Sequence, residues 1–206
     1  GNLRRSHYSN ELNASMDGAK VTVMGWVLTV RGHGNISFAT VHDKNGDLSI
    51  VAKKGDCSDE IREKISSLKA HSSIGIVGTI KASEKAPSGF EIIPTELRVF
   101  SEVTTIPPFE PTAKTVKNID TRLEVRPIDL RRNILQHVFK TRSLVLKTIR
   151  DYFNDQNFVE INTPKMIATA TEGGAALFPI FYYNKEAFLA QSPQLYKEQL
   201  TMSFEK

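Results

Sequence analysis

The sequence predicts an α+β protein, with a five-stranded β-barrel at the N-terminal end and a mixed region of helices and short strands behind it. Three observations lead to this prediction. Short apolar runs that alternate with polar residues and are separated by turn signals fill the first half of the chain. A stretch that contains several prolines follows and shows no periodicity. Beyond it, apolar residues recur with the 3.6-residue period of a helix.

Five strands are expected in the first half of the chain, because valine-rich or alternating runs of suitable length recur there. They are Lys20–Val30, Ile36–His42, Leu48–Lys53, Ser73–Ile80 and Phe90–Val99. Asn45-Gly46-Asp47 is a strong hairpin signal between the second and third strands. Ser58-Asp59 is expected to cap a short helix that runs through Leu68. Three strands, a helix and two further strands fit a five-stranded Greek-key barrel of the OB type.

Barrels of this type bind single-stranded nucleic acid by stacking bases on aromatic side chains. Phe38 on the second strand is the candidate platform, with Arg31 and either Lys53 or Lys54 near the phosphates. Periodicity alone favours the other interpretation, in which Phe38 belongs to the core of the barrel. The net charge of +4 permits nucleic-acid binding without requiring it.

The region 104–117 contains three prolines and is expected to be a semi-rigid linker between domains. A long helix follows, and either Asp129 or Asn133 is expected to cap its N-terminus, Asn133 through a capping box with Gln136. Basic residues decorate this helix. A solvated basic face explains them better than direct contact with RNA.

Three short strands are expected after the long helix. Phe158–Ile161 forms the first, and Thr163-Pro164 ends it because proline disrupts a strand ladder. Leu177–Tyr183 and Ala187–Ala190 are rich in aromatic and aliphatic residues and are separated by a short polar segment. This pattern is typical of a buried hairpin.

The residues with the clearest chemical potential flank this hairpin. Glu172 precedes Gly173 and Gly174, which lets the backbone bend beside a carboxylate. Gln194 and Lys197 follow the hairpin on a segment that begins with Ser192-Pro193, so a helix there would turn both side chains the same way. The segment offers one anion, one amide and one cation. A small zwitterion with an acidic side chain satisfies all three.

Composition excludes several other classes of protein. No apolar run approaches the ~20 residues that a membrane helix needs, and the first residues lack the apolar stretch of a signal peptide. Cys57 is the single cysteine, so neither an internal disulfide nor a cysteine-based zinc site can form. The five histidines lie too far apart in the sequence to indicate a metal site. We therefore expect a cytoplasmic protein that does not bind membranes.

Three strings in the second half resemble the aspartyl-tRNA synthetases of the archaeal and eukaryotic type, which are class II enzymes. They are Thr-Glu-Gly-Gly before the hairpin, Ala-Gln-Ser-Pro-Gln-Leu-Tyr-Lys after it, and Phe-Val-Glu-Ile-Asn-Thr-Pro-Lys-Met upstream. The resemblance extends over nearly the whole chain and implies three regions. These are an OB-fold anticodon-binding domain at 1–103, a linker at 104–128, and the N-terminal part of the catalytic domain at 129–206.

The resemblance also implies roles for the residues around the hairpin. Glu172 would accept hydrogen bonds from the α-ammonium of L-aspartate, and Gln194 would help to orient the substrate. Lys197 would pair with the side-chain carboxylate, and Leu195 and Tyr196 lie within the same substrate-binding segment. A neutral asparagine side chain would leave the Lys197 charge unpaired, which disfavours asparagine.

On the barrel, the resemblance implies that Phe38 stacks on an anticodon base of tRNA, with Arg31 beside it. Ser49 stands where relatives often carry a glutamine that reads a base. Pro87 resembles forms of the enzyme that accept tRNA-Asn as well as tRNA-Asp, although a turn proline explains it equally. Pro164 matches the signature proline of the first class II motif, which builds a homodimer interface in the family.

The implied reaction joins L-aspartate to ATP as aspartyl-adenylate and then transfers the aspartyl group to tRNA. The resemblance implies ATP and Mg²⁺ as cofactors, with their ligands in a second and a third motif that this chain lacks. We therefore expect the 206-residue chain to be inactive by itself.

Two alternatives stay open at this point. The chain could be a non-catalytic OB-fold module that binds RNA and dimerises, or part of a sister synthetase for asparagine or lysine. The neutral or cationic side chains of these substrates would match Lys197 poorly.

Overall fold

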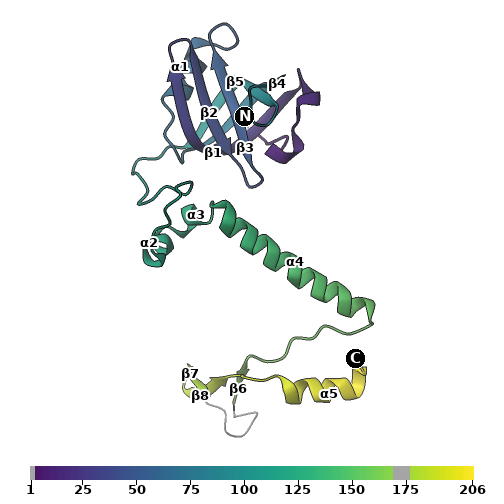
Figure 1. Ribbon diagram of the computed structural model, residues 1–206. Helices are drawn as coiled ribbons and strands as arrows, with labels where there is room; N and C mark the ends of the chain where they lie inside the picture. The colour runs from purple at the N-terminus through teal and green to yellow at the C-terminus, as the bar shows by residue number, and fades with distance from the viewer. Residues whose placement is uncertain (1–2, 169–176) are drawn as a thin grey trace. The chain divides into compact units, whose positions relative to one another are not determined.

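The computed structural model describes residues 3–168 and 177–206 (Figure 1). The chain divides into two compact units, Gly1–Arg131 and Arg132–Lys206. The first contains the barrel together with three short α-helices and two 3₁₀ helices. The second contains a long helix, a small sheet and a shorter helix.

The predicted barrel is confirmed. Its strands close in the order β1-β2-β3-β5-β4, and only the β3–β5 contact is parallel, through Ile50 and Ile92. The strands are β1 (Lys20–His33), β2 (Ile36–His42), β3 (Asp47–Lys53), β4 (Ser73–Ala82) and β5 (Phe90–Ser101). Two short 3₁₀ helices, Ser9–Glu11 and Ala14–Met16, precede them. Each predicted strand lies within an observed one. The observed β3 begins one residue before its prediction, and β1, β4 and β5 extend beyond their predicted C-terminal ends.

Alternation along the strands fills the interior of the barrel. Val21, Val23 and Val27 of β1 are buried, and Ile74 and Ile76 of β4 are buried with them. Gly25 lies between these positions, and a Cβ atom there would approach the carbonyl oxygen of His42 to 2.3 Å. Only glycine therefore allows β1 and β2 to approach so closely at this point.

The short helix α1 (Asp59–Ser66) also forms as predicted. The Ser58 hydroxyl caps it by accepting a hydrogen bond from the Ile61 amide at 3.3 Å. Ile65 is fully buried in the barrel core. The helix therefore packs against the barrel through its apolar face.

The predicted hairpin between β2 and β3 is organised by a buried carboxylate. Asp43 accepts hydrogen bonds from the amides of Asn45 and Gly46 at 2.8 and 3.1 Å, and from the amide and hydroxyl of Ser9 at 2.7 and 2.6 Å. Burial by itself raises the pKa of Asp43, but these donors outweigh it and leave the pKa lowered. Asp43 thus ties the N-terminal segment to the turn.

Two helices, α2 (Ile119–Glu124) and α3 (Arg126–Asp129), occupy the end of the region predicted as a linker. Asp129 is fully buried and pairs with Arg126 and with Nε of Arg122, the latter at 2.9 Å. Burial raises the pKa of the Asp129 carboxyl, and the two arginines overcome this and lower it. Asp129 therefore joins α2 to α3.

The long helix α4 (Asn133–Asp155) confirms the predicted period, but both capping predictions are wrong. Its N-cap is Arg132, and no side chain there makes a capping hydrogen bond. Asp129 cannot serve because its carboxylate is held by two arginines, and Asn133 already lies inside the helix.

The small sheet of the second unit has the order β6-β8-β7. Its strands are β6 (Met166–Ile167), β7 (Phe178–Tyr182) and β8 (Lys185–Leu189), and α5 (Gln194–Phe204) follows them. The hairpin is confirmed, but the expectation that it is buried is wrong, because Phe181 is 94% exposed. The predicted strand Phe158–Ile161 is also wrong, since no ladder pairs with it in the described ranges.

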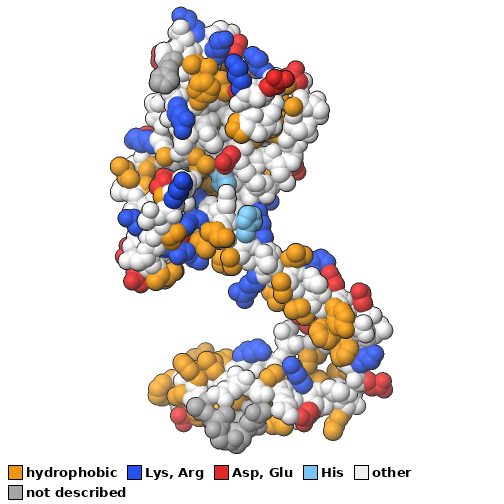
Figure 2. Space-filling model, viewed as in Figure 1, with side chains coloured by type: hydrophobic (Ala, Val, Ile, Leu, Met, Phe, Trp, Pro, Cys, Tyr) orange, Lys and Arg blue, Asp and Glu red, His pale blue; other side chains and the backbone are white. Residues whose placement is uncertain are grey.

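Apolar side chains remain exposed along α4, where no residue is classed as buried. Figure 2 shows hydrophobic side chains gathered along this helix. They include Val138, Leu144, Ile149 and Tyr152, each at least 49% exposed. None of the helices within the described residues is both long and apolar enough to cross a membrane.

Candidate functional site

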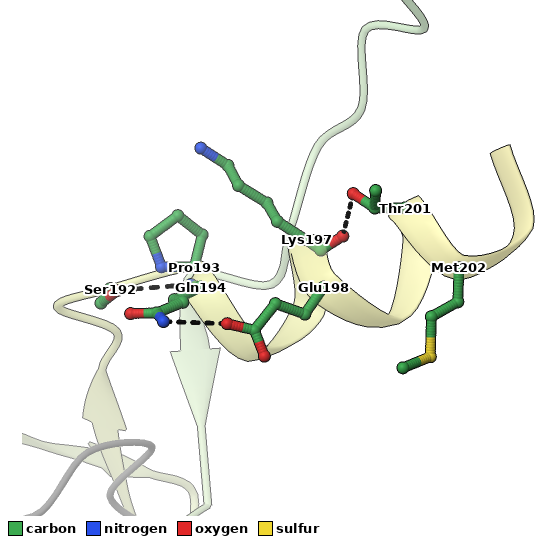
Figure 3. A pocket seen from close by; sticks show the side chains of 7 residues that line it. All are labelled: Ser192, Pro193, Gln194, Lys197, Glu198, Thr201 and Met202. Carbon is green, nitrogen blue, oxygen red and sulfur yellow. Dashed lines mark hydrogen bonds between the residues drawn. The ribbon is translucent and has the colours of Figure 1, made fainter. Parts of the chain in front are cut away.

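A pocket of about 570 Å³ opens at the start of α5 (Figure 3). Pro193 is the N-cap residue, and the chain enters the helix directly from the end of the β7–β8 hairpin. The lining residues come from along α5 and from the segment before it: Ser192, Pro193, Gln194, Lys197, Glu198, Thr201 and Met202. The predicted substrate residues Gln194 and Lys197 therefore border one cavity.

The Gln194 amide already has a partner in this pocket. Its Nε2 donates a hydrogen bond to Oε1 of Glu198 at 2.8 Å, while its backbone amide donates to the Ser192 hydroxyl at 3.3 Å. The first bond spans one turn of the helix and orients the amide plane (Figure 3). A ligand that accepts from this amide has to compete with Glu198.

Lys197 is exposed and leaves the helix in a different direction from Gln194, as Figure 3 shows, so the prediction that the helix turns both side chains the same way is wrong. Its side chain also borders a second cavity of about 340 Å³, lined by Ile149 and Phe153 of α4 and by Phe158 and Val159. Lys197 therefore borders both cavities, and the second one has the charged residues Arg150 and Glu160 in its lining beside the apolar ones.

The other predicted substrate residues are placed as follows. Leu195 is 48% exposed and Tyr196 is half-buried. Glu172 lies outside the described residues, so its distance from Lys197 remains a prediction. The described part of the chain contains no group of three His, Cys, Asp or Glu side chains suited to a metal ion. We therefore assign no residue to Mg²⁺.

On the barrel, Phe38 lies on the outer face of β2 and is 38% exposed, whereas its neighbours Ser37 and Ala39 are buried. This excludes the interpretation of Phe38 as a core residue. Arg31 of β1 pairs directly with Phe38 across the strands and is exposed. An aromatic ring and a guanidinium group thus lie side by side on the surface.

The same face carries a row of hydroxyl groups. Ser49 of β3 is half-buried and pairs with Thr40 of β2, whose hydroxyl accepts a hydrogen bond from Thr29 of β1 at 3.2 Å. Sequence reasoning identified Ser49 but missed the two threonines. Strand alternation was the available signal, since it places Thr40 on the same face as Phe38.

The two prolines with predicted roles are both exposed. Pro87 follows Ala86 in a tight turn of the β4–β5 loop, where the Gly89 amide donates to the Ala86 carbonyl at 2.9 Å. Proline suits the second position of such a turn, so a local structural role accounts for Pro87. Pro164 lies in an extended segment between α4 and β6.

Two families match separate parts of the chain. Residues 21–100 match the family of OB-fold nucleic acid binding domains, and residues 118–206 match the class II tRNA synthetases (D, K and N). The second match begins at the N-cap of α2, ahead of the boundary at 129 that the sequence predicts for the catalytic domain.

Known proteins resemble the chain over nearly its full length. It is 46% identical over 200 residues to the aspartate–tRNA(Asp/Asn) ligase of Methanococcus aeolicus, covering 97% of this chain and 46% of that protein. The ligase of the same name from Methanocaldococcus jannaschii is 47% identical over 197 residues, covering 96% and 45%. The chain thus spans about half the length of these relatives.

Among solved structures, the asparaginyl-tRNA synthetase of Pyrococcus horikoshii complexed with asparaginyl-adenylate matches with a TM-score of 0.87 and 29% identity, covering 98% of this chain and 46% of that one. The asparaginyl-tRNA synthetase of Entamoeba histolytica matches with a TM-score of 0.71 and 26% identity, covering 94% and 45%. Residues 118–206 thus match the class II tRNA synthetases of the D, K and N group, and they follow a segment that matches the OB-fold nucleic acid binding domains.

Proposed function

We propose that this chain contributes the anticodon-binding domain and the aspartate-binding segment of an aspartate–tRNA ligase. The observation that carries the proposal is that Gln194 and Lys197 line one pocket, in a chain 46% identical to an aspartate–tRNA(Asp/Asn) ligase. The ligase would activate L-aspartate with ATP and transfer it to tRNA. The family implies ATP and Mg²⁺ as cofactors, and no described residue is assigned to either.

Charge explains why L-aspartate suits this pocket. The Lys197 ammonium would bind the side-chain carboxylate, the Gln194 amide would orient the substrate, and Glu172 would accept hydrogen bonds from the α-ammonium group. Positioning of substrate, rather than a nucleophilic side chain, would be the contribution of these residues to catalysis.

The exposure of Lys197 limits how strongly its ammonium group can bind the aspartate carboxylate in the described part of the chain. An exposed ion pair contributes only about 0–1 kcal/mol. Discrimination of aspartate from asparagine by several kcal/mol requires a desolvated lysine. We therefore propose that further protein covers the pocket in the active enzyme, and that the chain alone forms no adenylate.

The barrel would bind the anticodon of tRNA through the face that carries Phe38, Arg31 and Ser49. Base stacking on Phe38 and phosphate contact by Arg31 would supply affinity, and the hydroxyl row that includes Ser49 would lie next to the bases. The relatives are named as ligases for both tRNA-Asp and tRNA-Asn, which supports use of both tRNAs by this protein. Charging assays with the two tRNAs decide this point.

We also propose a homodimer. The exposed apolar side chains of α4 and the extended segment around Pro164, whose backbone forms no strand ladder in the described ranges, would meet a second copy. Sedimentation of the full-length protein tests this proposal, and a monomer at micromolar concentration contradicts it. The single cysteine and the absence of a candidate membrane helix among the described residues agree with the cytoplasm as the proposed location.

Aspartate-dependent ATP–pyrophosphate exchange by the full-length protein tests the central proposal. Lys197→Met removes the charge and keeps the length of the side chain, so we expect kcat/KM for aspartate to fall about 100-fold. Lys185→Met is the matched control, because Lys185 is an exposed lysine of the same unit outside the pocket lining. Equal losses for both variants contradict the role of Lys197.

The same assay separates the alternatives. Equal activation of asparagine by the wild-type protein would favour a sister synthetase, an outcome that the resemblance to asparaginyl-tRNA synthetase structures makes worth testing. Binding of tRNA without any exchange activity would favour a non-catalytic RNA-binding module.

A further inference from the structure

The segment that follows β5 was expected to be a linker, but in the structure it is fastened to one corner of the barrel. Trp26 and Val27 of β1 form this corner together with the turn Lys69–Ser73 that leads into β4. The His71 amide donates to the Val27 carbonyl at 2.7 Å, and Trp26 pairs with Ser73. The corner is thus part of the closed barrel.

Two contacts attach the chain to this corner directly after β5. The Val103 amide donates a hydrogen bond to the Ser72 hydroxyl at 3.1 Å. The Lys69 ammonium lies 3.0 Å from a carboxylate oxygen of Glu102. The Lys69 and Glu102 side chains are both exposed, so their ion pair contributes little to stability. The hydrogen bond to the buried Ser72 is therefore the stronger of the two attachments.

A third contact involves a buried histidine. Nε2 of His71 lies 2.9 Å from Oε2 of Glu110, and His71 is only 8% exposed. Residues on either side of the carboxylate, Phe109 and Pro111, are buried as well. The other oxygen of Glu110 accepts from the Thr112 hydroxyl at 3.0 Å. The His71 ring is shielded from water, whereas the Glu110 side chain is 44% exposed, so the hydrogen bond is screened on the glutamate side only.

The last contact holds the end of the segment. The guanidinium carbon of Arg131 lies 4.3 Å from the centroid of the Trp26 ring, well within the range of a cation–π interaction. Nη1 of Arg131 is buried and has no hydrogen-bond partner among the described residues, and burial lowers the pKa of this arginine. Stacking on Trp26 is therefore its principal attachment. Asp129, two residues earlier, joins α2 to α3.

We propose that residues 102–131 form a strap that is a fixed part of the barrel unit, locked by the His71–Glu110 pair and by the stacking of Arg131 on Trp26. The joint between the two units then lies between Arg131 and Arg132, and not in the proline-containing stretch. All of these contacts lie within Gly1–Arg131, so the inference does not depend on the proposed function.

Hydrogen exchange of the 206-residue chain, followed by mass spectrometry, tests the contact between His71 and Glu110. A hydrogen bond to a charged group in this setting corresponds to about tenfold to 100-fold in an opening equilibrium. Glu110→Gln should accelerate exchange in peptides covering 103–113 by that factor and leave β1 and β4 unchanged. The matched control is Glu60→Gln, which removes an exposed pair with Lys64 on α1 and should leave 103–113 unchanged.

Two substitutions of Arg131 test its stacking on Trp26. Arg131→Leu removes the cation and should accelerate exchange in α3 about threefold to thirtyfold. Arg131→Lys keeps a cation over the ring and should produce a smaller increase.

Three outcomes would overturn the proposal. Exchange of 103–113 in the wild-type chain at the rate of an unstructured peptide would exclude the strap, and an unchanged rate in Glu110→Gln or Arg131→Leu would exclude the corresponding lock. A substitution that accelerates exchange throughout the barrel destabilises the whole unit and does not test one contact. The proposal then depends on the wild-type chain, in which the Val103 and Ala113 amides must be protected from exchange.

Discussion

Replacement of Phe38 by alanine distinguishes a surface for base stacking from a packing role. Full burial of a phenylalanine contributes about 1.5–3 kcal/mol to stability. Because Phe38 is 38% exposed, we expect its loss to cost the barrel only about 1–2 kcal/mol. Loss of a stacked base costs about 1–3 kcal/mol of binding, so the dissociation constant for tRNA should rise about fivefold to 150-fold.

Tritium-labelled tRNA-Asp retained on filters measures the affinity, and thermal denaturation measures the stability. Phe100→Ala is the matched control, because Phe100 is a 47% exposed phenylalanine on β5 of the same barrel. Stacking neutralises no phosphate, so Phe38→Ala should leave the salt dependence of binding unchanged. Arg31→Ala should reduce the slope of log K against log salt by about one.

Two results would refute this reasoning. Equal losses of tRNA affinity in Phe38→Ala and Phe100→Ala would show that neither ring is a specific platform. A stability loss of about 3–5 kcal/mol for Phe38→Ala would mean that the ring packs as a core residue, despite its position on the outer face.

The remaining predictions concern the barrel. Gly25→Ala should destabilise it by about 1–3 kcal/mol, because the new Cβ meets backbone that cannot move freely; an unchanged melting temperature would contradict this. Asp43→Asn should destabilise the chain by about 2 kcal/mol at pH 7. Since the pKa of Asp43 is lower in the folded state than in the unfolded chain, its contribution is present above about pH 4 and is lost as the pH falls further. The variant should therefore show a weaker acid dependence of its melting temperature between about pH 4 and 2, and an identical dependence would exclude this role.

Local signals predicted the elements of the barrel well. Alternation with a period of two identified its strands, the Asn45-Gly46 turn located the hairpin, and Ser58 marked the start of α1. The hairpin β7–β8 was found in the same way. Each of these features depends on neighbours within a few residues, so the sequence carries them directly.

Periodicity could not decide which side of an element is covered. Phe38 reads as a core residue from its apolar character, yet the closed barrel places it outside. The hairpin reads as buried because its strands are aromatic, yet Phe181 is exposed in the described chain. Phe158–Ile161 has strand composition, but a strand forms only where another strand pairs with it.

The sequence by itself determined the order of the elements, the OB-type barrel and the residue types of the segment that we propose to bind aspartate, because these follow from local patterns and short motifs. Only the tertiary structure decided that the proline-containing segment is fastened to the barrel and that Asp129 joins two helices rather than capping a third. The pairs involved, His71 with Glu110 and Trp26 with Arg131, are 39 or more residues apart. Such contacts depend on the closure of the whole barrel, which no local pattern encodes.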